Sequence, residues 1–242
     1  MFVRSFIFNV AFIASTALIS LTGSLLLPAP PRIMRQVQTT WGRVVFWLLK
    51  AIIGTDYEIR GRENFPTKPA VYVCKHQSAW DTLIFFLLNT DTVYVVKEEL
   101  VKIPFFGWLV SRAGSISVDR TAGMSALKAL VADTQARIDE GVNVVIFPEG
   151  TRSRVGEEGT YHPGVAALYK NVDAPIHPVA LNSGVFWSRR SFLKRRGTVL
   201  FEMLPEVPKG LDRRVFMQEL KTSIEGHSRA LEAESQRLLA DE

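Results

Sequence analysis

A histidine and an aspartate five positions apart have the clearest chemical potential in this sequence. His76 and Asp81 lie in the run CKHQSAWDTLIFFLL, residues 74–88. A carboxylate that accepts a hydrogen bond from an imidazole fixes the tautomer of the ring and leaves the other ring nitrogen free to take a proton. The pair therefore points to proton abstraction from a hydroxyl group or a water molecule.

The spacing of the two residues requires a break in the helix between them. On one continuous helix, residues five apart are separated by about 140° around the axis, so their side chains could not meet. The run SAWD, residues 78–81, has the spacing of a capping box, with Ser78 at the N-cap and Asp81 at the third helical position. We expect the cap to leave His76 outside the helix, where the carboxylate reaches it. The ordinary alternative is an aspartate that only caps the helix beside an unrelated histidine.

Cys74 is the alternative nucleophile. The two-residue period of a strand places its side chain on the same side as that of His76. A lone cysteine in an apolar strand is more commonly a small buried residue, and the chain contains no G-x-S-x-G nucleophile elbow. We therefore expect a reaction in which a group passes directly from one substrate to the other, rather than one with a covalent intermediate on the enzyme. No spacing of cysteines and histidines indicates a metal site.

Two arginine-bearing runs are predicted to follow strands. FPEGTRSR, residues 147–154, carries Glu149, Gly150 and Arg152, and GSISVDR ends in Arg120. A guanidinium fork suits phosphate oxygens, and a glycine lets backbone amides approach an anion. The ordinary alternatives are a surface turn with a Glu149–Arg152 ion pair and a solvated Arg120. Together with the His-Asp pair, these runs indicate an anionic acceptor held beside a base.

The elements that must position these residues follow a βαβ rhythm. Strands are predicted at 70–76, 92–98, 115–118, 142–147, 174–182 and 198–207, and helices at 78–89, 100–114, 124–141, 164–171 and 212–240. This alternation predicts an α/β domain with a largely parallel sheet flanked by helices. Ligands gather at the carboxyl ends of the strands in such sheets, which is where the polar runs lie.

The amino-terminal region predicts a membrane anchor. Residues 5–31 carry no charge, and at about 1.5 Å per residue they are long enough to cross a bilayer core of roughly 30 Å. A cleaved signal peptide is the alternative, although its apolar region is usually shorter. The run at 32–54 alternates basic residues with Trp41, Trp47 and aliphatics, which favours a helix in the membrane interface over an ordinary core-facing helix. We expect the anchor to cover residues 1–55 and the α/β domain residues 56–242.

The charge balance favours an anionic surface as partner. The chain has 29 Lys+Arg against 24 Asp+Glu, and the net charge of +5 is too mild to indicate nucleic acid. The run RRSFLKRR, residues 189–196, either docks on anionic lipid or forms a solvated loop. The basic residues after the first apolar helix exceed those before it, so we expect a membrane protein whose catalytic domain faces the cytoplasm.

The order of these motifs resembles that of the 1-acylglycerol-3-phosphate O-acyltransferases, within the wider glycerolipid acyltransferase family. HQSAWD is similar to the family's His-x4-Asp block, GSISVDR to its second block, FPEGTRS to its third, and IHPVALNSG, around Pro178, to its fourth. The similarity covers about residues 57–207. Four blocks in the same order are far more specific than any single block.

The resemblance implies the glycerolipid acyltransferase fold and a transferase reaction. A fatty acyl group would pass from acyl-CoA or acyl-carrier protein to the sn-2 hydroxyl of 1-acylglycerol-3-phosphate, which is lysophosphatidic acid, and would give phosphatidic acid in the bilayer. The resemblance implies that His76 is the general base, that Asp81 orients it, and that the acceptor's phosphate lies near Arg120, Glu149, Gly150 and Arg152. Glu149 cannot attract a phosphate itself, so we expect it to position an arginine. No cofactor or metal ion is implied besides the acyl donor.

Two further hypotheses remain open. The first is an acyltransferase of the same family that acts on another lysophospholipid or on a glycerol-phosphate acceptor. The second is a lipid-binding protein that keeps the anchor and the basic loops without catalysis, against which the intact pair of His76 and Asp81 argues.

Overall fold

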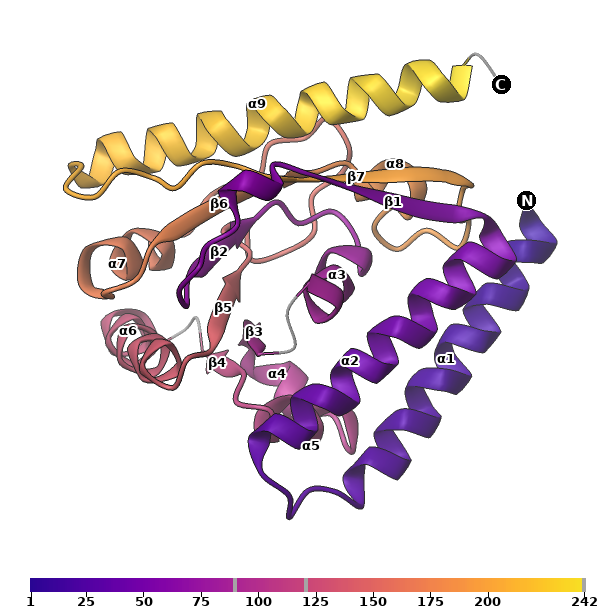
Figure 1. The fold of residues 1–242 in the computed structure, drawn as a ribbon, viewed down its shortest axis with the longest axis horizontal. Coiled ribbons are helices and arrows are strands. Elements are labelled where there is room, and N and C mark those ends of the chain that lie inside the picture. The colour runs from indigo at the N-terminus through magenta and orange to yellow at the C-terminus, as the bar shows by residue number, and fades with distance from the viewer. Residues whose placement is uncertain (89–90, 120–121, 241–242) are drawn as a thin grey trace.

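A seven-stranded sheet forms the centre of the described part of the molecule (Figure 1). The computed structural model describes residues 1–88, 91–119 and 122–240. The strand order is β1-β7-β6-β2-β5-β3-β4. The strands are β1 Thr55–Arg60, β2 Val71–Cys74, β3 Thr92–Lys97, β4 Ile116–Val118, β5 Asn143–Ile146, β6 Ile176–Leu181 and β7 Gly197–Met203.

The sheet is mostly parallel, as the sequence predicts. β2 pairs in parallel with both β5 and β6, and β3 with both β4 and β5. β6 and β7 are antiparallel, with Val179 opposite Met203, while β1 is parallel to β7. All residues of β2, β5 and β6 are buried, which explains why these strands are almost continuously apolar.

Helices cover the sheet on both faces. The helices are α1 Phe2–Ser24, α2 Pro31–Leu48, α3 Trp80–Leu88, α4 Glu98–Val101, α5 Phe106–Arg112, α6 Gly123–Asp139, α7 Gly164–Asn171, α8 Ser183–Phe186 and α9 Arg213–Ala240, with a π-helical turn η1 at Leu49–Ile53 and a 3₁₀ turn η2 at Arg62–Asn64. One apolar cluster joins α1, α2 and α3 to the sheet through Phe8, Phe46 and Phe85. A second cluster joins α6, α7 and α9 through Leu130, Leu168 and Phe216. Figure 1 shows α9 running along one side of the sheet and α1 beside α2 on another.

The helix predicted after β3 and the strand at one edge of the sheet differ from the prediction. The helix expected at 100–114 is broken into α4 and α5, because Pro104 cannot continue a helix and Phe105 has a left-handed φ of 62°. The strand β1 is an addition at the sheet edge. Its run TDYEIR alternates charged residues with Tyr57 and Ile59, a period that indicates a strand with one polar face.

The two amino-terminal helices pack on the α/β unit. α1 is long and apolar enough to cross a bilayer by its length and composition. Its buried residues include Ser5, Ser20 and Gly23, whereas Phe6 and Ile13 are 54% and 66% exposed. α2 buries Met34, Val45 and Phe46, so this face fits the core-facing alternative rather than a helix that only lies in an interface.

Candidate active site

The capping box brings His76 and Asp81 together, as their spacing predicts. The Ser78 hydroxyl oxygen accepts a hydrogen bond from the Trp80 N–H at 3.2 Å, and Asp81 Oδ2 accepts one from the Ser78 N–H at 2.8 Å. His76 therefore lies between β2 and α3, outside the helix. Its Nδ1 is 3.0 Å from Asp81 Oδ2.

The buried carboxylate of Asp81 is surrounded by donors. Besides His76 Nδ1, it accepts hydrogen bonds from the backbone N–H groups of Gln77 and Ser78 and from the hydroxyl of Ser183. A carboxylate in this setting accepts a hydrogen bond from the protonated Nδ1 of a neutral imidazole. The unprotonated Nε2 is then the atom that can accept a proton. The ring of His76 is further fixed by stacking on Phe147, with centroids 3.9 Å apart.

The surroundings of His76 favour its neutral form. Burial lowers the pKa of His76 below its ordinary value, and this effect outweighs the hydrogen bond and the charge of Asp81, which raise it. The charges of Arg152 and Arg189 lower the pKa further. A neutral imidazole at pH 7 can act as a general base, so protonation does not block the site under ordinary conditions.

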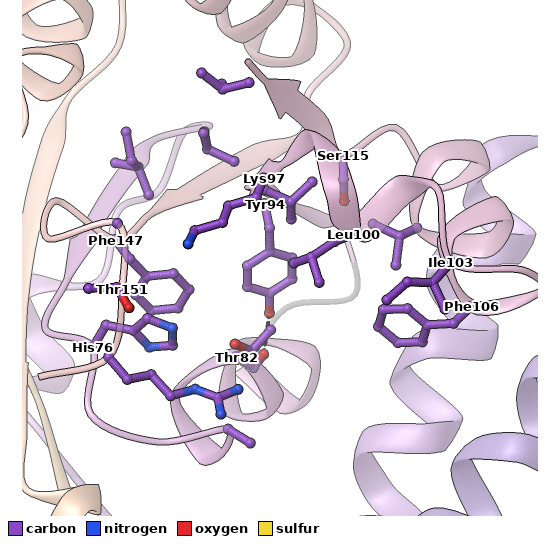
Figure 2. Close-up of a pocket in the computed structure, with 18 of the residues that line it drawn as sticks. His76, Thr82, Tyr94, Lys97, Leu100, Ile103, Phe106, Ser115, Phe147 and Thr151 are labelled. Carbon is purple, nitrogen blue, oxygen red and sulfur yellow. Dashed lines mark hydrogen bonds between the residues drawn. The ribbon is translucent and has the colours of Figure 1, made fainter. Parts of the chain in front are cut away.

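A large apolar cavity opens beside His76. Its volume is about 1250 Å³, and its walls come from α1, α2, α3, β3, α5, α6 and the loop after β5. Figure 2 shows His76 and Phe147 at one side of this cavity and Ile103 and Phe106 at the other. Among the described residues, the lining contains no carboxylate, while its cations are Lys97, Arg152, Arg189 and Arg190. The cavity thus combines space for an alkyl chain with positive charge near the base.

The loop after β5 is tied to the His76 segment. The N–H and the hydroxyl of Ser153 both donate to the carbonyl oxygen of His76, at 2.8 and 3.1 Å. Gly150 has a φ of 62°, a left-handed conformation that favours glycine. The N–H of Gly150 donates to Phe147 O at 2.9 Å, so this amide forms the turn instead of facing an anion. Arg152 lines the cavity, and burial lowers the pKa of its guanidinium.

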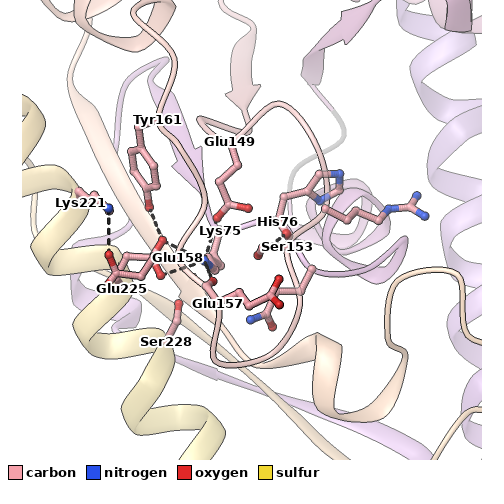
Figure 3. A network of polar contacts seen from close by, with 12 residues as sticks. Lys75, His76, Glu149, Ser153, Glu157, Glu158, Tyr161, Lys221, Glu225 and Ser228 are labelled. Carbon is pink, nitrogen blue, oxygen red and sulfur yellow. Dashed lines mark hydrogen bonds and ion pairs between the residues drawn. The ribbon is translucent and has the colours of Figure 1, made fainter.

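Glu149 does not line the cavity, and Figure 3 shows its side chain directed toward Lys75. It is buried and forms an ion pair with Lys75, whose Nζ lies 2.9 Å from Glu149 Oε1. Burial raises the pKa of Glu149 to about 7 despite the opposing charge of Lys75. The expected arginine partner is therefore replaced by a lysine next to His76 in the sequence. Arg120 lies outside the described residues.

Several polar residues around the pair of His76 and Asp81 were not predicted from the sequence. Lys75 and Gln77 flank His76, Ser183 follows β6, and Glu225 and Glu232 come from α9. Ser183 lies inside the run IHPVALNSG, so its position could have been noticed. No local pattern predicts that two glutamates more than a hundred residues away are buried against Lys75 and Gln77, because this depends on how α9 packs against the sheet.

Cys74 is unsuited to act as a nucleophile. Its side chain is fully buried in the apolar cluster under α3, and burial raises the pKa of the thiol well above its ordinary value. A thiol reacts as a thiolate, which this environment disfavours.

The Cys74→Ala variant is therefore expected to keep its kcat within about threefold of that of the original protein. Initial rates of turnover, measured on samples with matched circular dichroism spectra, provide the check. A loss of turnover in a folded Cys74→Ala variant would restore the covalent hypothesis.

Comparison with known proteins identifies the family. The model of the family described as "Acyltransferase" matches residues 56–182. These residues include β2, α3, β5 and β6, and therefore His76, Asp81 and the loop after β5. The helix α9 lies outside the matched residues.

Named relatives and a solved structure are similar to the chain. The 1-acyl-sn-glycerol-3-phosphate acyltransferase of Pseudomonas aeruginosa is 39% identical over 165 residues, which are 68% of this chain and 64% of the relative. The protein of the same name from Cocos nucifera is 31% identical over 173 residues, 71% of this chain and 56% of the relative. The chain therefore matches less than two thirds of the length of these relatives. The crystal structure of the acyltransferase PlsC from Thermotoga maritima matches 96% of this chain and 98% of its own, with a TM-score of 0.77 at 21% identity, and so has the same fold.

Proposed function

The chain belongs to the acyltransferase family, and from this premise we propose that it is a 1-acylglycerol-3-phosphate O-acyltransferase. In this proposal, a fatty acyl group passes from acyl-CoA or acyl-carrier protein to the sn-2 hydroxyl of 1-acylglycerol-3-phosphate, giving phosphatidic acid. The observation that carries the proposal is the Asp81-bound imidazole of His76 at the wall of an apolar cavity whose charged lining residues, within the described chain, are cations.

The proposed mechanism is direct transfer with His76 as general base. Nε2 of His76 takes the proton of the acceptor hydroxyl while the oxygen attacks the thioester carbonyl carbon, and Asp81 stabilises the imidazolium that forms. The tetrahedral intermediate then collapses, the carbon–sulfur bond breaks, and the thiolate takes the proton from the imidazolium. Because a thiol has a pKa of about 8.5, the leaving group needs no strong acid. The reaction as proposed requires no metal ion, no cofactor and no acyl-enzyme.

The acceptor's phosphate is proposed to bind near Arg152 and Arg120. The guanidinium of Arg152 lies at the cavity wall, and an arginine fork suits phosphate oxygens. Arg189 also lines the cavity and donates to the carbonyl oxygen of Arg152 at 2.7 Å, so it is a further candidate for binding the phosphate, a role that the sequence did not predict for the run RRSFLKRR. In this proposal Gly150 shapes the loop, and Glu149 supports it from behind through Lys75.

The chain is proposed to act at a membrane with its α/β unit on the cytoplasmic side. The outward face of α1 is apolar, which is not expected of a helix that faces water, and its inward face carries Ser5, Ser20 and Gly23 as well as Phe8. Near one end Asn9 donates to Phe192 O at 3.0 Å, and near the other Gly23 packs against Val37 and Leu109. Since α1 contacts the protein near both ends, a position within one leaflet fits this packing better than a helix that crosses alone.

Competition among acceptors tests the proposal against its alternative. The purified protein in lipid vesicles would receive one acyl donor with equimolar 1-acylglycerol-3-phosphate, other lysophospholipids, glycerol 3-phosphate and monoacylglycerol, and mass spectrometry would quantify the products. We expect phosphatidic acid to dominate, and monoacylglycerol to react poorly because it lacks the phosphate. Preferential acylation of another lysophospholipid or of glycerol 3-phosphate would establish the alternative, and saturable binding of phosphatidate without turnover of any donor would favour the lipid-binding hypothesis.

The pH dependence of the reaction provides a further prediction. Because burial lowers the pKa of His76, the acid limb of kcat/KM is expected below about pH 6.5, the ordinary value of histidine. Removal of a nearby cation raises the pKa of an imidazole, so Arg189→Gln is expected to move this limb to higher pH. The substrate phosphate also titrates near a pKa of about 6, but it does so in both proteins. The difference between the two pH profiles therefore reports the histidine, and an unchanged limb or a shift to lower pH would contradict its assignment as the base.

A further inference from the structure

The inward face of α9 carries an unusual stripe of polar residues. Its members recur at helical spacing and are all buried, namely Glu225, Ser228, Glu232 and Ser235. Burial of a carboxylate is costly unless hydrogen bonds compensate for the lost water. These side chains form hydrogen bonds with residues at or after the ends of strands of the sheet, so their polar atoms have partners inside the protein.

Glu232 reaches the residue that follows His76. Glu232 Oε1 accepts a hydrogen bond from the side-chain amide of Gln77, and Oε2 accepts one from the N–H of Gly156 at 3.0 Å. The other end of the Gln77 amide is also fixed, because its Oε1 accepts a hydrogen bond from the N–H of Gly184 at 3.1 Å. Glu232 therefore holds together three segments that follow β2, β5 and β6.

These three segments carry the groups that surround the base. The backbone N–H of Gln77 donates to Asp81 Oδ2 at 2.6 Å, and the residue before Gly184 is Ser183, whose hydroxyl donates to Asp81 Oδ1. Gly156 belongs to the loop in which Ser153 bonds the carbonyl oxygen of His76. A small displacement of any of these segments would change the hydrogen bond between imidazole and carboxylate.

We propose that Glu232 is a positioning residue for the His76–Asp81 pair and acts through the side chain of Gln77. The proposal rests on the proposed function only where turnover is measured. It assigns a catalytic consequence to a helix outside the residues matched by the family model. Glu232 lies outside the cavity lining, and its expected effect is on the chemical step rather than on substrate affinity.

The variant Glu232→Gln removes one hydrogen bond while keeping the shape of the side chain. An amide offers one acceptor oxygen to two donors, Gly156 N–H and the Gln77 amide, so donor faces donor at one of the contacts. Gln77 cannot reverse its amide without losing the hydrogen bond that its oxygen accepts from the N–H of Gly184. Misplacement of a catalytic group by about 1 Å can cost about 100-fold in rate, so we expect kcat to fall by about tenfold or more with KM unchanged within about twofold.

An exchange of the two side chains provides the rescue. In the double variant Gln77→Glu/Glu232→Gln, the introduced carboxylate accepts from Gly184 N–H and from the introduced amide, whose oxygen accepts from Gly156 N–H. Every hydrogen bond has a counterpart and the net charge is unchanged, so kcat is expected to return most of the way. Glu234→Gln is the matched control, since it removes the carboxylate that binds Arg60 from the same helix, away from His76, and is expected to leave kcat unchanged.

A second readout does not depend on turnover. The proton on Nδ1 of His76 gives a downfield NMR resonance when it is hydrogen bonded to Asp81, and its absence in His76→Ala assigns it. We expect the resonance in the original protein, in Glu234→Gln and in the double variant, and its shift or loss in Glu232→Gln. If the original protein fails to acylate any acceptor, the proposed function fails and this resonance alone decides the role of Glu232.

The proposal would be overturned if Glu232→Gln had the same kcat and the same His76 Nδ1 proton resonance as the original protein. If Glu232→Gln fails to fold, the double variant decides: recovery of the fold, of kcat and of the resonance supports the proposal. A double variant that stays unfolded, or that folds without either signal, overturns it because all the hydrogen bonds were supplied.

Discussion

The His76→Ala variant is expected to lose about 10²- to 10⁴-fold in kcat/KM for acyl transfer, the range that a positioned general base contributes. The variant removes the atom to which the geometry gives the role of proton acceptor, Nε2 of the Asp81-bound ring. The loss should fall mainly on kcat, because the phosphate and the acyl chain are proposed to bind elsewhere in the cavity. Initial rates in vesicles at saturating donor and acceptor separate kcat from KM.

His227→Ala is the matched control for this variant. His227 Nδ1 also lies 3.0 Å from a carboxylate, that of Glu202, but the pair is on the surface of α9 and β7 and outside the cavity. We expect His227→Ala to retain its activity. If His76→Ala keeps more than about a tenth of the original kcat/KM while its circular dichroism spectrum is unchanged, His76 is not the base.

The Lys75→Ala variant is expected to lower the free energy of unfolding by about 3–5 kcal/mol, the cost of removing one partner from a buried ion pair. Lys75 Nζ lies within hydrogen-bonding distance of both carboxylate oxygens of Glu225, at 2.8 and 2.9 Å, and 2.9 Å from Glu149 Oε1. Tyr161 donates to Glu225 from the other side at 3.1 Å. Without the ammonium, two buried carboxylates would face each other between α9 and the loop after β5 (Figure 3).

The buried carboxyl groups determine how the loss of stability in Lys75→Ala changes with pH. Burial raises the pKa of Glu149 to about 7, and loss of Lys75 removes a charge that lowers it. A carboxyl group whose pKa is higher in the folded than in the unfolded chain contributes less stability as pH rises through the folded value. The destabilisation by Lys75→Ala is therefore expected to be larger at about pH 8 than at about pH 5.

Denaturation by urea in detergent, followed by circular dichroism at both pH values, measures this effect. Lys221→Ala is the control, because Lys221 pairs with Glu158 on the surface and its removal should leave the midpoint nearly unchanged. A midpoint for Lys75→Ala equal to that of the control would mean that water replaces the ammonium, and would refute the role of Lys75 as the link between α9 and the sheet.

The sequence predicts the elements best where their periodicity is strong. The buried strands β2, β5 and β6 and the helices α6, α7 and α9 lie where the apolar patterns indicate them. β1 is harder to predict because half of its residues are charged and it lies at the edge, where one face meets water. The antiparallel pairing of β6 with β7 could not be predicted, because the connection through α8 is long enough for either strand direction.

The candidate site also has features that the sequence predicts and features that depend on the three-dimensional fold. The capping box predicts the meeting of His76 and Asp81 because both residues lie in one local structure. The partner of Glu149 could not be predicted, since Arg152 is near it in the sequence whereas Lys75 follows another strand and meets Glu149 only in the fold. Glu225 and Glu232 reach the site through the packing of a helix, which no local pattern describes.

The most direct test of the central claim measures thiol release from acyl-CoA by the purified protein in vesicles, with and without 1-acylglycerol-3-phosphate. Direct transfer through His76 predicts that CoA appears only when the acceptor is present, in a one-to-one ratio with phosphatidic acid. Release of CoA without the acceptor, in a burst equal to the amount of enzyme, would indicate an acyl-enzyme. That result, or release with the acceptor but without phosphatidic acid, would contradict the account.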